Sequence, residues 1–187
     1  METETIVLGG GCFWCTEAVF KMLKGVVSVE PGYACSTLFK TSPPFMPRSI
    51  APTYEQVSLG ETPYVEAVEI VYDPDSLAFE EILQVYFATH DPTTLNQQGA
   101  DVGPQYASVI FYTIPRQQEK SRHYIDVLNR GGYTKPIVTR VEPLEVFYKA
   151  EDYHKNYFER NKSAGYCQLV IAPKVEKVEN KFKHLLK

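Results

Sequence analysis

Two cysteines with the spacing Cys-x-x-C, Cys12 and Cys15, follow a run of three glycines near the start of the chain. The apolar residues 6–8 before them predict a strand, and the amphipathic residues 18–23 after them predict a helix. The glycines then form the corner between strand and helix, and Cys12 lies where the helix begins. Because the first amides of a helix carry partial positive charge, we expect them to stabilise the thiolate of Cys12, which is the nucleophilic form.

Two large aromatic residues, Phe13 and Trp14, follow Cys12 directly, and Trp14 is the only tryptophan of the chain. An activated sulfur beside an aromatic wall indicates chemistry on a small, apolar, polarisable group. A phosphate site is disfavoured because residues 9–11 lack both the dinucleotide-binding fingerprint and the ending of a Walker loop. A Cys-x-x-C pair at a helix start is also typical of redox and metal sites.

A carboxyl group is predicted to face the core from the strand at Val65–Tyr72. Glu66 is in phase with the apolar residues Val68, Ile70 and Tyr72 of this strand. Loss of hydration would raise the pKa of the Glu66 carboxyl group. The alternative is that Glu66 lies in water at the start of the strand.

Length and composition predict an ordinary soluble globular protein of one domain. The chain has 187 residues, 44% hydrophobic residues and a net charge of −4, which argues against a general nucleic-acid binder. The acidic N-terminus has no apolar segment typical of a signal peptide, and no run reaches the length of a membrane span. Four cysteines without a secretion signal predict a reducing compartment, the cytoplasm, and reactive thiols rather than structural disulfides. Nothing requires more than a monomer.

The order of predicted elements is strand, helix, strand, twice over, followed by further helices and strands. This order predicts an α+β protein with a ferredoxin-like split βαβ core, added helices and strands, and long loops. We expect a single catalytic domain over residues 1–187, with a long Pro-rich loop at 36–53 and a C-terminal helical tail at 174–187. The other predicted strands are 26–30, 106–113 and 136–141; the helices are 79–88, 115–129 and 151–158; and residues 93–105 are a loop.

The opening motif, Gly11-Cys12-Phe13-Trp14 with Glu17, resembles the signature of the A-type peptide methionine sulfoxide reductases. Further blocks resemble that family in the same order over roughly residues 5–170. They are residues 31–33, 52–57, 66–69, 71–74, 90–93, 98–101, 105–106 and 165–167.

The resemblance implies an enzyme that reduces methionine-S-sulfoxide, free or in oxidised proteins, to methionine, and so repairs oxidative damage. No metal or organic cofactor is expected. Cys12 would attack the sulfoxide sulfur, Glu66 would supply a proton, and Cys12 would be left as sulfenic acid. A second thiol would condense with it to a disulfide, which thioredoxin would reduce. The implied substrate-binding residues are Phe13 and Trp14 around the methyl group, and Tyr54, Asp101 and Tyr106 around the oxygen and water.

Three cysteines could form that disulfide with Cys12. Cys167 is favoured because it matches the C-terminal family block, Cys15 could close the Cys-x-x-C pair, and Cys35 would take part only if its loop folds inward. The chain departs from the family pattern at Cys35-Ser36, at residues 63–65 before Glu66, at Val102 and at Pro104, and its Pro-rich loop is longer. These departures alter the rim of the expected site.

Two other functions compete with this one. A thioredoxin-like disulfide oxidoreductase would use Cys12 and Cys15 without consuming methionine sulfoxide. A metal-binding module would need four thiolates, although Cys35 and Cys167 are solitary and far apart in sequence. Without the resemblance, Tyr54 and Tyr106 would be ordinary packing residues, and Asp101 a turn residue.

Overall fold

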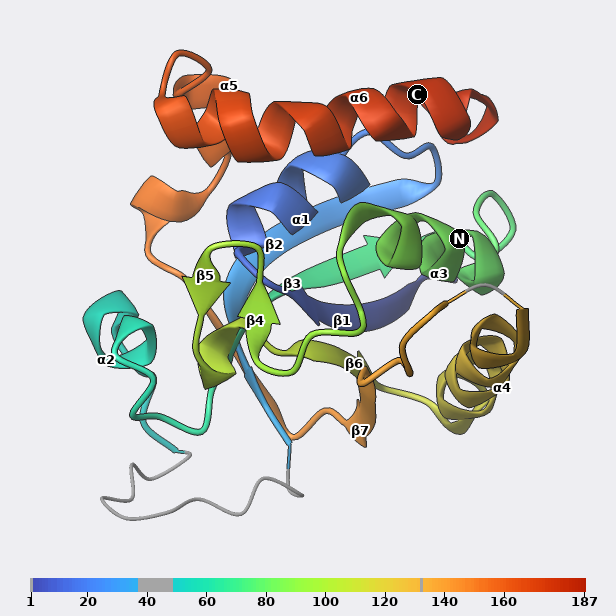
Figure 1. Cartoon of the computed structure of the whole chain (residues 1–187), viewed down its shortest axis with the longest axis horizontal. Coiled ribbons are helices and arrows are strands. Elements are labelled where there is room, and N and C mark those ends of the chain that lie inside the picture. The colour runs from blue at the N-terminus through green and yellow to red at the C-terminus, as the bar shows by residue number, and fades with distance from the viewer. Residues whose placement is uncertain (1, 37–48, 132) are drawn as a thin grey trace.

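A six-stranded sheet in the order β7-β6-β1-β3-β2-β8 is the centre of the computed structural model, which describes residues 2–36, 49–131 and 133–187 (Figure 1). Its inner strands β1, β2, β3 and β6 are antiparallel, with β3 between β1 and β2. This is the split βαβ arrangement, so the predicted α+β, ferredoxin-like fold is confirmed. The strands are β1 (Glu4–Gly10), β2 (Val26–Cys35), β3 (Val65–Tyr72), β6 (Ser108–Tyr112), β7 (Arg140–Pro143) and β8 (Val146–Lys149).

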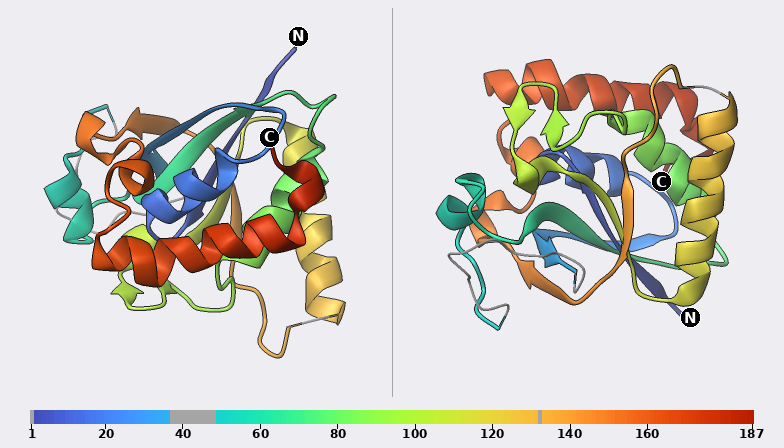
Figure 2. Two further views of the ribbon diagram at one scale, coloured as in Figure 1. Left: turned by 90° about the horizontal axis from the view of Figure 1, so that it is seen from above. Right: turned by 60° about the horizontal axis from the view of Figure 1, so that its bottom comes forward.

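Helices cover one face of this sheet. The first crossover helix, α1, leads from β1 to β2, and α3 leads from β3 to β6; the longer C-terminal helix α6 lies across α1 (Figure 2). The helices are α1 (Phe13–Phe20), α2 (Tyr54–Ser58), α3 (Phe79–Thr89), α4 (Pro115–Gly131), α5 (Tyr157–Arg160) and α6 (Ala172–Lys181). A π-helical stretch, Cys167–Ile171, leads directly into α6.

The alternation along β3 divides its side chains between the two faces of the sheet. Val68, Ile70 and Tyr72 belong to the main core under the helices, whereas Val65 and Ala67 belong to a smaller cluster on the opposite face. Glu66 is therefore on the helical face, as its phase in the sequence predicts, and its side chain is buried.

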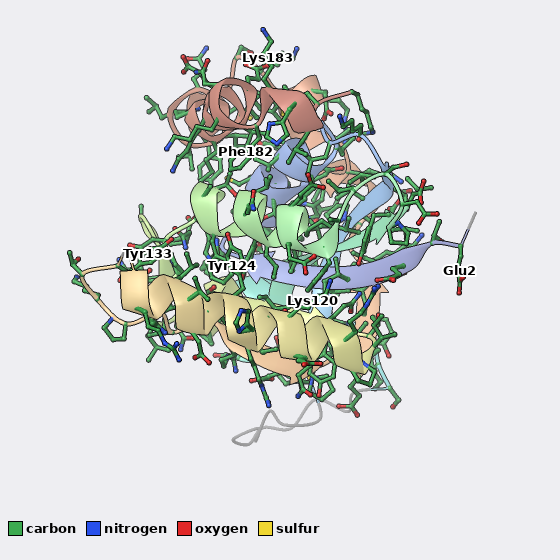
Figure 3. The ribbon with its side chains drawn as sticks, turned by 90° about the vertical axis from the view of Figure 1, so that its right-hand side faces the viewer. Glu2, Lys120, Tyr124, Tyr133, Phe182 and Lys183 are labelled. Atoms are coloured by element: carbon green, nitrogen blue, oxygen red, sulfur yellow. The ribbon has the colours of Figure 1, made fainter. Side chains whose placement is uncertain are left out.

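The helix α4 packs against α3 at the edge of the molecule. The Tyr124 ring of α4 stacks on Phe87 of α3 with centroids 5.6 Å apart, and Figure 3 shows Tyr124 between the two helices. Lys120 adds an ion pair of 2.6 Å with Glu80. These contacts lie away from Cys12, so they hold α4 against α3 and do not shape the candidate site.

Some predicted elements have different bounds in the structure. The strand expected at 136–141 begins only at Arg140, because the Val138 amide donates to the carbonyl of Pro92 instead of to a neighbouring strand. The helix expected at 151–158 is a 3-10 turn, Asp152–His154, and the short α5, separated by Asn156 with φ of 57°. Residues 93–105 contain a small hairpin of β4 (Gln97–Gln98) and β5 (Asp101–Val102). The Pro-rich loop falls largely at 37–48, outside the described residues.

Candidate active site

The glycine corner places Cys12 at the N-cap of α1. Gly11 has φ of 88°, in the left-handed region that side chains rarely adopt, and a Cβ there would lie 2.6 Å from the side chain of Gln98. The chain can turn this sharply only with glycine at that position. The turn leaves the Cys12 side chain 8% exposed, at the floor of a pocket rather than at the surface.

The Glu66 carboxyl group approaches the same helix start from β3. Its Oε2 accepts a hydrogen bond of 3.2 Å from the amide of Phe13, the first residue of α1. Glu66 is only 2% exposed, and burial raises the pKa of its carboxyl group to about 8, against the opposing effect of the Phe13 hydrogen bond. Glu66 is therefore largely protonated at neutral pH and can act as a proton donor.

One pocket, here named the Cys12 pocket, collects the predicted catalytic thiol, the acid and all the predicted substrate-binding residues. It encloses about 300 Å³ of empty space that opens to solvent. The structure therefore brings together seven predicted residues that are dispersed in the sequence between Cys12 and Tyr106. Its lining residues are Cys12, Phe13, Trp14, Tyr54, Glu66, Asp101, Tyr106 and Tyr166.

The two thiols of the Cys-x-x-C motif have opposite pKa shifts. Burial, the thiol of Cys15 and the charge of Glu66 raise the pKa of Cys12 well above its usual value, so the expectation of a free thiolate stabilised by the helix N-terminus is wrong. Desolvation outweighs the partial charge of the helix here. A hydrogen bond from Cys12, with the positive charge of Lys174, lowers the pKa of Cys15 to about 7.

The remaining cysteines lie in different places. Cys167 is fully buried in one apolar cluster with Cys12 and Cys15, and burial raises the pKa of its thiol. Cys35 ends β2 and lies in the main core, outside that cluster. The four thiols thus do not converge, and no group of three or more His, Cys, Asp or Glu side chains among the described residues is arranged to hold a metal ion.

Three phenol groups surround the Cys12 pocket and remain protonated at neutral pH. Burial raises the pKa of Tyr54 to about 12 and raises those of Tyr106 and Tyr166 further. The Tyr166 hydroxyl donates a hydrogen bond of 2.8 Å to Oδ2 of Asp101. Tyr54 and Tyr106 thus supply protonated hydroxyl groups to the pocket that Cys12 and Glu66 also line.

A family model described as peptide methionine sulfoxide reductase matches residues 4–186. The chain belongs to this family. It is an oxidoreductase that acts on methionine sulfoxide.

Curated relatives and solved structures agree with this assignment. The peptide methionine sulfoxide reductase of Picrophilus torridus is 50% identical, over 96% of this chain and 95% of its own length. That of Chromobacterium violaceum is 49% identical over 98% of both chains. Reduced Mxr1 of Saccharomyces cerevisiae has a TM-score of 0.76 at 29% identity, covering 89% of this chain and 90% of its own. Mxr1 in complex with Trx2 has a TM-score of 0.55 at 20% identity, covering 83% and 85% respectively.

Sequence reasoning missed three aromatic residues that hold the pocket of this reductase together. Tyr166 was part of a family block but had no assigned role, and it lines the Cys12 pocket. His154 accepts a hydrogen bond of 3.1 Å from Nε1 of Trp14, and Tyr157 stacks on Trp14 with centroids 3.7 Å apart. The local pattern Tyr-His-x-x-Tyr at residues 153–157 predicts only a helix, and its spacing gives no indication of a partner 140 residues away.

Two carboxyl groups, the buried Glu17 and the half-buried Glu151, attach the segment that carries His154 to the rest of the reductase. Glu17 of α1 is 1% exposed and accepts the amide of Asn156 with both oxygens, at 2.9 and 3.0 Å. Glu151 accepts the hydroxyl of Tyr33 at 2.7 Å and the amide of Tyr54 at 2.9 Å. Glu151 thereby joins Tyr54, a wall of the pocket, to the β-sheet.

Helices in the described part of the reductase are too short or too polar to cross a membrane.

Proposed function

We propose that the chain reduces the S epimer of methionine sulfoxide, free or in proteins, through a sulfenic acid on Cys12. The observation that carries this proposal is the convergence of Cys12, the protonated Glu66 and the aromatic pair Phe13 and Trp14 on one pocket. A sulfoxide needs all three: a nucleophile for its sulfur, a proton for its oxygen and an apolar surface for its methyl group. The whole chain, 1–187, would act as one catalytic domain.

In the first step, Cys12 attacks the sulfoxide sulfur while Glu66 donates its proton to the sulfoxide oxygen. The proton of the Cys12 thiol passes to the carboxylate of Glu66, so Glu66 is restored and no net proton is consumed. The oxygen then passes to Sγ of Cys12 as both the S–O bond of the substrate and the transient bond between the two sulfurs break. Methionine leaves as the thioether, and Cys12 carries the hydroxyl group of a sulfenic acid. The Phe13 amide would stabilise the transient carboxylate through its hydrogen bond to Oε2.

Substrate orientation would follow from three fixed positions around the sulfur. The methyl group would lie on Phe13 and Trp14, the oxygen beside Glu66 with Tyr54, Tyr106 and Asp101 nearby, and the attacking thiol below. The sulfoxide sulfur is a chiral centre. If the positions of its methyl group, its oxygen and the attacking thiol are fixed, and the rest of the substrate extends toward the pocket mouth, only one epimer fits. The family resemblance assigns that hand as the S epimer.

Regeneration would begin with an intramolecular disulfide between Cys12 and either Cys15 or Cys167, since all three share one buried cluster. Thioredoxin would then reduce the disulfide by thiol–disulfide exchange. The solved complex of Mxr1 with Trx2 supports this partner. Cys35 is not a candidate resolving residue in this scheme because it lies in another part of the core.

Steady-state assays with each epimer of a capped methionine sulfoxide and dithiothreitol test the proposal. The wild-type protein should consume the S epimer at least about 100-fold faster than the R epimer, and Cys12→Ser should consume neither. Cys35→Ser is the matched control and should retain the wild-type rate. Comparable turnover of both epimers, or turnover by Cys12→Ser, would contradict the proposal. Reduction of protein disulfides without consumption of sulfoxide would favour the thioredoxin-like alternative.

A further inference from the structure

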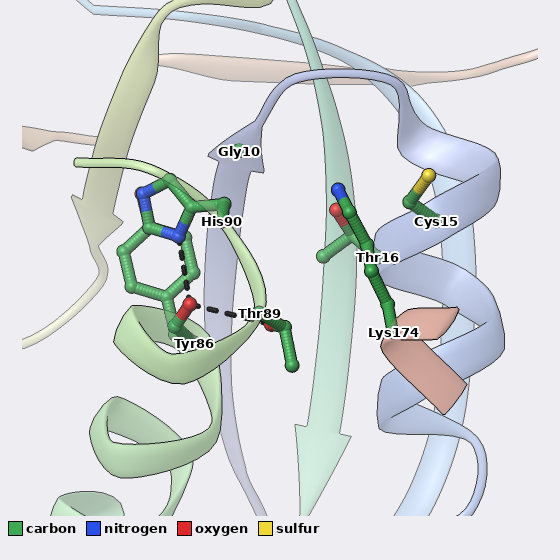
Figure 4. Close-up of a pocket in the computed structure, with 7 residues that line it drawn as sticks. All are labelled: Gly10, Cys15, Thr16, Tyr86, Thr89, His90 and Lys174. Atoms are coloured by element: carbon green, nitrogen blue, oxygen red, sulfur yellow. Dashed lines mark hydrogen bonds between the residues drawn. The ribbon is translucent and has the colours of Figure 1, made fainter. Parts of the chain in front are cut away.

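A second pocket, here named the Lys174 pocket, lies against Cys15. Its lining residues are Gly10, Cys15, Thr16, Tyr86, Thr89, His90 and Lys174, and its empty space is about 220 Å³ (Figure 4). Cys12 lines the Cys12 pocket and Cys15 lines this one. The two thiols of the motif therefore have different surroundings, although the Cys15 amide donates to the carbonyl of Cys12 at 3.2 Å.

Lys174 supplies the only positive charge among the residues that line this pocket at neutral pH. None of the lining residues is acidic, and burial lowers the pKa of His90 to about 4. Both ring nitrogens of His90 are also engaged, at 2.7 Å from the carbonyl of Tyr86 and 2.7 Å from the hydroxyl of Ser108. Lys174 itself is half-buried, and no hydrogen bond or ion pair joins its ammonium group to another residue in the described part of the chain.

We propose that the Lys174 ammonium group stabilises the thiolate of Cys15 and thereby makes Cys15 the nucleophile that resolves the sulfenic acid of Cys12. This inference rests on the proposed function. The Cys15 thiolate attacks Sγ of Cys12, an S–S bond forms as the S–O bond breaks, and the leaving hydroxide takes the proton that Cys15 has released. The products are a disulfide and water, and no external oxidant is needed. Lys174 is a positioning residue in this step because it acts through Cys15.

The groups facing Cys15 explain why Lys174 matters most after the first step. Besides Lys174 on α6, they are the Cys12 thiol, Tyr166, Asp101, Glu66, Cys167 and the neutral His90. In the reduced protein the hydrogen bond from the Cys12 thiol is the main stabiliser of the thiolate. Oxidation of Cys12 removes that thiol, whereas the charge of Lys174 remains. Among the described residues no cation lowers the pKa of Cys167, and burial raises it, so Cys167 is the weaker nucleophile at neutral pH.

The test is a single turnover of the full-length protein without reductant. Each protein is mixed with one equivalent of capped methionine-S-sulfoxide and quenched in acid, and mass spectrometry follows methionine release and the Cys12–Cys15 disulfide. The lag is the delay between methionine release and formation of the Cys12–Cys15 disulfide. In Lys174→Met at pH 7, this delay should be about tenfold longer than in the wild type. The lag should shrink at pH 9, where the Cys15 thiolate forms without help. Lys174→Arg should retain the wild-type lag, and so should the matched control Lys177→Met, an exposed position of the same helix.

Any of four results would overturn the inference. The first three are an unchanged lag in Lys174→Met, a lag that does not depend on pH, and a disulfide that joins Cys12 to Cys167 in the wild type. Equal slowing of methionine release and disulfide formation would also overturn it, because that pattern indicates a general disturbance of the fold. Absence of methionine release from the wild type is a separate outcome, since it would refute the proposed function itself.

Discussion

The indole Nε1–H of Trp14 donates a hydrogen bond of 3.1 Å to Nδ1 of His154, a residue that is 1% exposed and 140 positions away in sequence. Burial lowers the pKa of His154, so its ring stays neutral and Nδ1 remains available as an acceptor. Together with the stacked ring of Tyr157, this bond fixes the plane of Trp14 at the wall of the Cys12 pocket. Because the Trp14 ring is held in one orientation, it can provide a fixed apolar surface for the methyl group of the substrate.

Replacing His154 should therefore weaken substrate binding. His154→Leu leaves the indole N–H without its acceptor, which costs about 1–3 kcal/mol, and kcat/KM for capped methionine-S-sulfoxide should fall about tenfold. His154→Asn, which retains an acceptor oxygen, should lose less. Because Trp14 is the only tryptophan, its fluorescence spectrum should shift in His154→Leu and not in the exposed control His123→Leu. An unchanged spectrum with full activity would show that this hydrogen bond does not hold the wall.

Glu66 should impose an alkaline limit on the chemical step. Its carboxyl group is protonated below its pKa of about 8, so the rate of methionine release in a single turnover should decline as pH rises above this value. Glu66→Gln cannot donate a proton, and its rate should be lower by about 100-fold or more and should show no decline above pH 8. Glu69→Gln, on the same strand, is the matched control. If Glu66→Gln retained the wild-type rate, the proton would come from another group.

The buried carboxyl group of Glu66 should also lower the free energy of unfolding of the protein as pH rises. Its pKa rises from the ordinary value of 4.5 to about 8 on folding, so the folded protein binds this proton more tightly than the unfolded chain. That contribution to stability is fully present below pH 4.5 and is lost as pH rises through about 8. The stability of Glu66→Gln relative to the wild type should therefore increase over this range, by on the order of a few kcal/mol. Urea unfolding at several pH values measures it, and a constant difference would be the contrary result.

Glu17 should hold the pocket together from a distance. Glu17→Ala removes both acceptors of the Asn156 amide and should lower the free energy of unfolding by about 1–3 kcal/mol. The segment with His154 and Tyr157 would loosen, so KM should rise more than kcat falls. Glu17→Gln, which retains one acceptor, should be milder. Denaturant unfolding and kinetics on the same samples provide the check. If Glu17→Ala retained the wild-type KM, Glu17 would have no influence on substrate binding in the Cys12 pocket.

Local patterns in the sequence predict much of the fold and part of the candidate site. The alternation along Val65–Tyr72 predicted both β3 and the inward direction of Glu66, because a strand has period two. The glycine corner predicted the position of Cys12 at a helix start. The lowered pKa expected for Cys12 failed because burial depends on distant elements, which cover the thiol and outweigh the local helix dipole.

Contacts between distant segments could not be read from the sequence. The amide of Asn156, where the helix expected at 151–158 is interrupted, donates to Glu17, and the indole of Trp14 donates to His154. No sequence spacing predicts either of these contacts. Tyr54, Asp101 and Tyr106 were assigned to the site by resemblance alone, and they do line the Cys12 pocket. The sequence predicts only a surface tail around Lys174, because Lys174 and Cys15 come to line one pocket only when α6 packs across α1.

The central claim is that Cys12 takes the oxygen of methionine sulfoxide. The most direct measurement is a single turnover of the S epimer without reductant, with methionine and free thiols counted in the same sample. We predict one methionine released per chain, the loss of two of the four thiols, and Cys12 in the resulting disulfide. Methionine released by Cys12→Ser, or release by the wild type with all four thiols still free and unoxidised, would contradict the account.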